Sequence, residues 1–171
     1  MKRHWQYLKY VLRHKWFVYK AGRKIGVPFI TLLLHDWDKF LPSAWVSYAN
    51  TFYDSSGKTR YEPHKDFAVE WCKHQNRNKH HWQYWLLTWD RGEEECMPMP
   101  DYAIKEMLAD WIGAGAAVKG SPVWKWYDEN SIKIKLHDDT RSNVEQWLNW
   151  LELMNDNKKA EWDKVLKGSK R

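Results

Sequence analysis

One stretch of the chain joins a strongly apolar run to several charged residues, and it reads Pro28-Phe-Ile-Thr-Leu-Leu-Leu-His-Asp-Trp-Asp-Lys-Phe40. Proline is favoured in the first turn of a helix, because the backbone N–H that it lacks would have no partner there. We therefore predict a buried helix over residues 29–40. His35 and Asp36 end its apolar part, and such groups are costly to bury without partners. The stretch thus predicts a helical core with a polar site at its edge.

The segments on both sides carry helical periodicity as well. Apolar residues at spacings of three and four over residues 4–20 are typical of an amphipathic helix. We expect further helices over 42–53, from Pro63 to about 75, over 80–89, over 101–118 and from about 139 onward. Residues 93–100 are expected to form a loop, and the strictly alternating residues 132–136 an extended segment without a partner strand.

These elements predict an all-α, single-domain compact helical bundle. The whole chain, residues 1–171, would form this domain, with the core over about residues 4–118 and a C-terminal helical extension over about 139–168. Of the 14 tryptophans, we expect most to be buried where helices pack. Those expected in the core are Trp5, Trp16, Trp45, Trp71, Trp82, Trp111, Trp147 and Trp150.

Composition and charge narrow the class of function. With 43% hydrophobic and 29% charged residues, the chain has a globular composition, which argues against wholesale disorder. No apolar run is long enough to cross a membrane, and we expect no secretory signal. Two cysteines exclude a disulfide framework and a four-cysteine zinc site, which favours a reducing cytoplasm. The net charge of +6 favours an anionic partner, either nucleic acid or a phosphorylated small molecule such as a nucleotide, although a solvated basic surface would explain it too.

The His35-Asp36 pair is the first candidate for chemistry. An imidazole nitrogen and a carboxylate oxygen are ordinary ligands for zinc, manganese or iron, so one divalent ion would satisfy both groups. Lys39 follows one helical turn later and could hold a phosphate oxygen beside that ion. Alternatively, Asp36 could simply pair with Lys39.

A second group of candidates lies around a predicted break at residues 76–78. His74 precedes the break and the His80-His81 pair follows it, so the three imidazoles can turn toward one point. Arg77 adds a cation suited to phosphate. We expect only His74 and one of the two adjacent histidines to face a metal, because neighbours on a helix point in directions that differ by about 100°.

Two more residues complete the set. Asp110 stands among apolar neighbours, where a carboxylate is rare unless it is paired or ligating. His14 lies between Leu12 and Trp16 on the first predicted helix. His14 or His64 could supply the remaining metal ligand. Any one of these residues alone is more easily explained as a hydrogen-bonded side chain. Several helical segments, however, each place a histidine or aspartate where it requires a partner, and this favours a shared ion.

The order of these residues resembles that of the HD-domain metal-dependent phosphohydrolase superfamily, and most closely its HD-GYP-type branch. His35-Asp36-Trp37-Asp38-Lys39 resembles the HDxGK element, and Lys79-His80-His81-Trp82 resembles the paired-histidine element. The sequence departs from the family at two points: no Gly-Tyr-Pro follows the histidine pair, and Asp38 replaces the glycine before the lysine. The chain is also similar to small phage-type proteins that share the His-Asp…Lys-Phe and His-x-x-Arg-Asn-x-His-His elements.

This resemblance implies a helical phosphohydrolase with one or two divalent ions of manganese, iron, zinc, cobalt or magnesium. A metal-bound hydroxide would attack a nucleotide or cyclic-nucleotide phosphoester, with Asp36, Lys39 and Arg77 as the catalytic residues. The implied metal ligands are His14, His35, Asp36, His74, His80, His81 and Asp110. Two other functions stay open: a di-iron oxygenase built on the same ligands, and a non-enzymatic module that binds nucleic acid or a partner protein. The sequence leaves the oligomeric state open.

Overall fold

Two long helices that pack along each other form the centre of the fold: α1 (Lys2–Lys24) and α5 (Asp101–Val118). They approach closely at Gly113, where a Cβ atom would lie only 2.7 Å from the backbone nitrogen of Val18. Glycine therefore allows a separation between these helices that no other residue would. The computed structural model describes the backbone of residues 1–168 and the side chains of residues 1–156.

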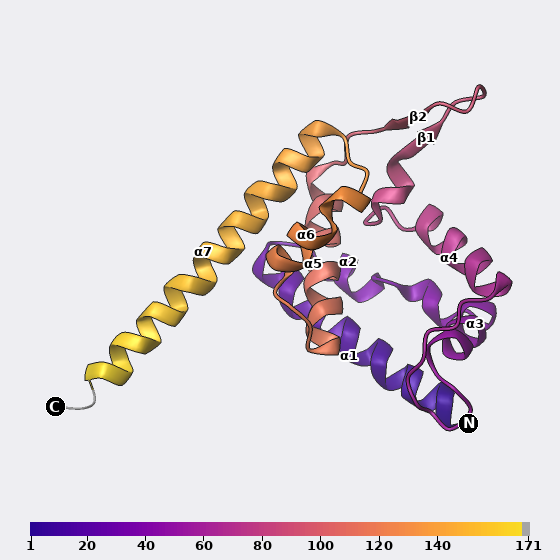
Figure 1. Ribbon diagram of the computed structural model, residues 1–171, viewed down its shortest axis with the longest axis horizontal. Coiled ribbons are helices and arrows are strands. Elements are labelled where there is room, and N and C mark those ends of the chain that lie inside the picture. The colour runs from indigo at the N-terminus through magenta and orange to yellow at the C-terminus, as the bar shows by residue number, and fades with distance from the viewer. Residues whose placement is uncertain (169–171) are drawn as a thin grey trace.

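The other elements surround this pair in a single, mostly helical domain (Figure 1). The short 3₁₀ helices are labelled η. In chain order, the remaining elements are α2 (Phe29–Leu34), η1 (Trp37–Phe40), α3 (Pro42–Phe52), α4 (Lys65–Arg77), η2 (Trp82–Trp85), β1 (Leu86–Thr88), β2 (Glu94–Cys96), α6 (Val123–Asn130), η3 (Ser131–Lys133) and α7 (Asp138–Gly168).

Two apolar clusters fill the interior. The larger one joins the second half of α1 and most of α5 to α6 and the first turns of α7, with Leu108 and Val144 fully buried in it. The smaller, aromatic one joins the first half of α1 to α3 and α4, and includes Tyr7, Tyr48 and Phe67. The later turns of α7 extend away from the body, and the β1–β2 hairpin projects on another side (Figure 1).

The predicted helix over residues 29–40 is in fact interrupted. α2 ends at Leu34, and Asp36 takes a left-handed backbone conformation with φ 55° before η1 begins. This helix is also less buried than we predicted, since Phe29, Ile30 and Leu33 are each more than half exposed. The interruption turns the His35-Asp36 pair inward instead of continuing the helix along the surface.

The predicted helix over residues 80–89 is wrong. Those residues form η2 and strand β1, which pairs antiparallel with β2 in the register Leu86↔Cys96. The predicted loop over residues 93–100 thus contains a strand, and the two-stranded sheet makes the fold mostly rather than wholly helical. Residues 132–136, predicted as extended, begin within η3 and only then become irregular.

The prediction of core tryptophans is wrong for three of the eight residues. Trp5 and Trp16 are each 57% exposed and Trp150 is 42% exposed. The other five are partly buried and pack at the edges of the two clusters. The indole ring is too large to be covered completely between helices of this size. Among the described residues, no helix has both the length and the apolarity that a membrane crossing requires.

Candidate metal centre

The seven residues predicted as metal ligands come together around Asp36, and we call them the His–Asp cluster. The interruption after α2 places Asp36 in the interior, where its exposed fraction is 0%. An aspartate tolerates the left-handed conformation better than most residues do. His14 comes from α1, His74 from the end of α4, His80 and His81 from the turn that follows it, and Asp110 from α5.

The two carboxylate oxygens of Asp36 face different histidines. Oδ1 lies 3.4 Å from Nε2 of His74 and 3.4 Å from Nε2 of His80. Oδ2 lies 3.2 Å from Nε2 of His14 and 3.4 Å from Nε2 of His35. A carboxylate placed in this way can bridge two ions, one on each oxygen.

The cluster therefore has two sides. On the Asp110 side, Oδ1 of Asp110 lies 3.1 Å from Nε2 of His14 and 3.4 Å from Nε2 of His35. On the triple-histidine side, Nε2 of His81 lies 2.9 Å from Nε2 of His74. Each side, taken with Asp36, offers four ligand atoms that all lie within 4.8 Å of one another.

Both adjacent histidines face Asp36, contrary to our expectation that one would turn away. His80 and His81 lie in a turn between α4 and η2 rather than in a helix. The 100° rotation between helical neighbours therefore does not apply to them, and their rings lie side by side with centroids 4.3 Å apart.

Two carboxylates outside the cluster contact the Nδ1 atoms of three of its imidazole rings, whose Nε2 atoms face Asp36. Glu106 lies 3.0 Å from Nδ1 of His35 and 3.2 Å from Nδ1 of His80. Asp38 lies 2.9 Å from Nδ1 of His74. Metal-binding histidines commonly donate their second N–H to a carboxylate, which fixes the ring and raises its basicity.

Glu106 was not among the residues predicted from the sequence, where Asp38 stood only as a departure from a motif. Glu106 lies one helical turn before Asp110 on α5, which is mostly apolar. Two carboxylates four residues apart on such a helix share a face, and that spacing was the available signal. Asp38 gave no comparable signal, because only the folded chain brings it to His74.

Several cluster atoms lack a hydrogen-bond partner. Among the described residues, the buried atoms without one include Nε2 of His35, Nε2 of His80 and Oδ1 of Asp36. Each unpaired buried group costs about 1–3 kcal/mol. All three belong to the cluster, so a divalent ion placed there would compensate groups that now have no partner. The donor set, imidazole nitrogens with carboxylate oxygens, fits such an ion.

The close charges of the cluster shift the pKa values of its own members. Burial raises the pKa of Asp36, but the charges of His35 and Lys39 lower that pKa well below the usual aspartate value. Burial also raises the pKa of Asp110, and the close imidazoles of His14 and His35 outweigh that effect and lower it. Both carboxylates are therefore ionised. Burial and the neighbouring His80 lower the pKa of His81 well below the usual histidine value, so its ring is neutral and free to bind an ion.

A sequence model of one family, described as a family of unknown function (DUF5662), matches residues 3–150 and so includes the whole His–Asp cluster. The chain belongs to this family. No curated protein and no solved structure matches it.

The two predicted phosphate-binding cations lie in different surroundings. Nζ of Lys39 donates a 2.6 Å hydrogen bond to Oδ2 of Asp36, and Lys39 also lines a cavity beside the cluster. Arg77 instead donates a 2.9 Å hydrogen bond to Asp38, and its guanidinium lies over the ring of Trp37. Arg77 does not line that cavity, so it supports Asp38 rather than facing a ligand.

His64 lies outside the cluster. It caps the start of α4, where its Nδ1 accepts a hydrogen bond from the backbone of Phe67, and it is exposed. His14, and not His64, therefore completes the Asp110 side.

The cavity beside the cluster, which we call the inner pocket, has a volume of about 370 Å³. Its walls combine cluster residues with aromatic side chains: Tyr7, Tyr10, His14, Lys39, Tyr48, Phe52, Tyr61, Phe67, Trp71, His81, Asp110 and Ala114. The hydroxyls of Tyr7 and Tyr48 are buried and have no hydrogen-bond partner among the described residues. The inner pocket therefore offers aromatic surface and one ammonium group next to the cluster.

Proposed function

We propose that this protein is a metal-dependent phosphohydrolase that acts on the phosphoester of a nucleotide. One observation carries the proposal. The Nε2 atoms of His35, His74 and His80 converge on the two oxygens of Asp36, while carboxylates fix the Nδ1 atoms of the same rings. Histidines that bind metals commonly have this arrangement, with one ring nitrogen toward the ion and the other held by a carboxylate.

Two ions would be held by different ligands. His14, His35 and Asp110 with Oδ2 of Asp36 would hold one, and His74, His80 and His81 with Oδ1 of Asp36 would hold the other. Divalent ions in such a site activate water and polarise a phosphoryl oxygen, which are the two requirements of phosphoester hydrolysis.

The residues of the inner pocket would bind and orient the substrate. Lys39 borders both Asp36 and the pocket, so its ammonium can approach a phosphoryl oxygen while it remains close to the carboxylate. The charges of Asp36 and Asp110 outweigh burial and raise the pKa of Lys39, which keeps it protonated. The aromatic walls suit a nucleobase and keep bulk water away from the reacting group.

The first experiment measures metal content and activity together. Protein purified without a histidine tag is analysed for metals and then assayed on a panel of nucleotide phosphoesters. The Asp36→Ala variant is expected to lose both the metal and phosphate release, because Asp36 belongs to both sides of the cluster. His64→Ala is the matched control, since this exposed histidine lies outside the cluster, and it should retain both.

Three other outcomes would contradict the proposal, and two of them would favour a different function. Full metal occupancy in folded Asp36→Ala protein would contradict the metal assignment. Bound iron with oxygen consumption and no phosphate release would favour the di-iron oxygenase. Wild-type protein that holds no metal but binds nucleic acid in a salt-dependent way would favour the binding module.

A further inference from the structure

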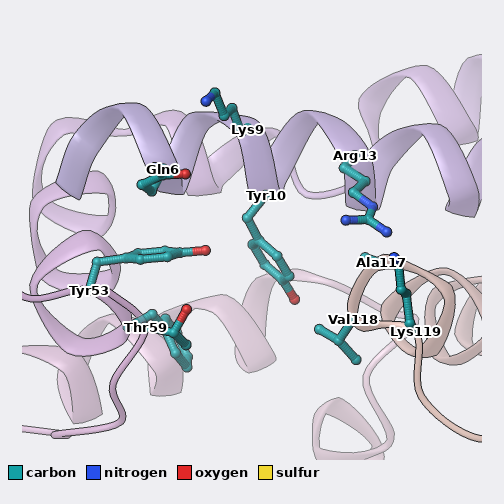
Figure 2. Close-up of a pocket in the computed structure, with 10 residues that line it drawn as sticks. Gln6, Lys9, Tyr10, Arg13, Tyr53, Thr59, Ala117, Val118 and Lys119 are labelled. Carbon is teal, nitrogen blue, oxygen red and sulfur yellow. The ribbon is translucent and has the colours of Figure 1, made fainter. Parts of the chain in front are cut away.

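A second cavity, which we call the outer pocket, lies next to the inner one and has a volume of about 610 Å³. Tyr10 projects into the middle of it, between Tyr53 on one side and Val118 on the other (Figure 2). Its walls come from α1, from the end of α3 with the loop that follows, and from the end of α5. The same two helices, α1 and α5, also supply His14 and Asp110 to the cluster.

The outer pocket is positively charged. Arg13 from α1 and Lys119, the residue that follows α5, extend toward the same part of it, whereas the ammonium of the lining residue Lys9 points away from it (Figure 2). Among the described residues that line this pocket, none is acidic. Over the described side chains, none of the three cations forms an ion pair with a carboxylate. The guanidinium of Arg13 lies over the ring of Phe17, and the ammonium of Lys9 lies over the ring of Trp5.

The two pockets share walls, because Tyr10 and Phe52 line both of them. Tyr10 lies one turn from His14 on α1, with its ring stacked beside that imidazole at 6.1 Å. On α5, Asp110 and Ala114 line the inner pocket and Ala117 lines the outer one, so successive turns lead from one to the other. A ligand that occupies the inner pocket therefore has the basic outer pocket as its neighbour.

We propose that the outer pocket binds a second anionic group of the substrate, and that the preferred substrate is a nucleoside carrying two separate phosphates. This inference rests on the proposed function. One phosphate would lie at the His–Asp cluster, the nucleoside against the aromatic walls around Tyr10, and the second phosphate between Arg13 and Lys119. A guanidinium and an ammonium without carboxylate partners are the groups that proteins use for phosphate.

The test compares two substrates that differ by one phosphate: adenosine 5′-monophosphate and adenosine 3′,5′-bisphosphate. Phosphate release from each is measured with the wild-type protein and with the Arg13→Ala and Lys119→Ala variants. Each variant is expected to raise KM for the bisphosphate roughly tenfold to a hundredfold, the effect of losing one charge-assisted hydrogen bond. KM for the monophosphate should stay the same. Arg23→Ala is the matched control, because this exposed arginine of α1 lines neither pocket.

A binding measurement separates this inference from the proposed function. Calorimetric titration of metal-free protein with adenosine 3′,5′-bisphosphate should show weaker binding in Arg13→Ala than in Arg23→Ala, whether or not either compound is hydrolysed. If the protein hydrolyses both compounds equally well, and Arg13→Ala and Lys119→Ala change neither KM, the second anion subsite is disproved while the phosphohydrolase assignment stands. If neither compound is hydrolysed but binding depends on Arg13, the subsite stands and the proposed reaction fails.

Discussion

The two sides of the His–Asp cluster differ in their ligands and in the structure that holds them. The Asp110 side has two carboxylates when Asp36 is included, and its His14 and Asp110 lie on the long helices α1 and α5. The triple-histidine side has only the carboxylate of Asp36, and its histidines lie at the end of a helix and in a turn. Carboxylate-rich sites favour manganese or magnesium, whereas imidazole-rich sites favour zinc or iron. We therefore expect the two sides to bind ions with different preferences.

Removing one ligand from each side should separate the two ions. Asp110→Ala is expected to lose the ion of its own side and to retain the other, and His81→Ala should do the reverse. Each variant should lose roughly a thousandfold or more in turnover, because one metal contributes several kcal/mol to stabilising the transition state. Metal stoichiometry and phosphate release measured on the same samples check this. If either variant loses both ions, the two sides form one cooperative site.

Replacement of Lys39 is expected to have the next largest effect on turnover. Its ammonium lies on the Asp110 side of Asp36 and faces the inner pocket. Lys39→Ala is therefore expected to lower turnover roughly a hundredfold, the loss typical for one preorganised charge, while both ions stay bound. Lys105→Ala is the control, since Lys105 pairs with Asp101 and lies outside the pocket. An unchanged turnover would show that Lys39 only neutralises Asp36.

The carboxylates that contact the Nδ1 atoms of the histidines also differ between the two sides of the cluster. Glu106 holds one histidine on each side, His35 and His80, whereas Asp38 holds only His74. Glu106→Gln should therefore weaken both ions, and Asp38→Asn only the ion of the triple-histidine side. Each loss is expected to be roughly tenfold to a hundredfold in affinity. Competition with a metallochromic chelator measures both constants, and equal effects of the two variants on both ions would contradict the assignment.

The residues of the His–Asp cluster could be predicted from the sequence better than the directions in which their side chains point. His35 and Asp110 could be found because each is a polar residue beside or within an apolar helical pattern, whereas His14 was suggested by the order of residues that resembles the HD-domain superfamily. The directions of His80 and His81 could not be predicted, because they depend on a turn that the sequence suggested to be helical. Glu106 was within reach of the same reasoning that identified Asp110, since the two are one turn apart.

The fold was predictable where periodicity was long and regular. The predicted helix over 101–118 matches α5, and the periodic segment 4–20 lies within α1. The hairpin was missed because its strands are only three residues long, too short for alternation to be distinguished from a helical pattern. Its turn residues Asp90-Arg91-Gly92 were the better signal, and Gly92 has the positive φ of 92° that such a turn requires.

The smallest expected effect tests whether the packing of the two long helices supports the Asp110 side. A Cβ atom at Gly113 would lie 2.7 Å from the backbone nitrogen of Val18, so Gly113→Ala must push α1 and α5 apart. We expect it to cost about 1–3 kcal/mol of unfolding free energy, as overpacking does elsewhere. Gly115→Ala is the control, because its Cβ would lie 3.4 Å from its nearest neighbour, an ordinary contact, and alanine favours the helix. His14 and Asp110 lie on these two helices, so Gly113→Ala should weaken the ion on the Asp110 side more than the other. Thermal unfolding with and without added metal measures the loss of stability, and metal titration measures the affinity of each side. An equal loss of affinity on both sides would show that the packing of α1 against α5 supports the cluster only as a whole.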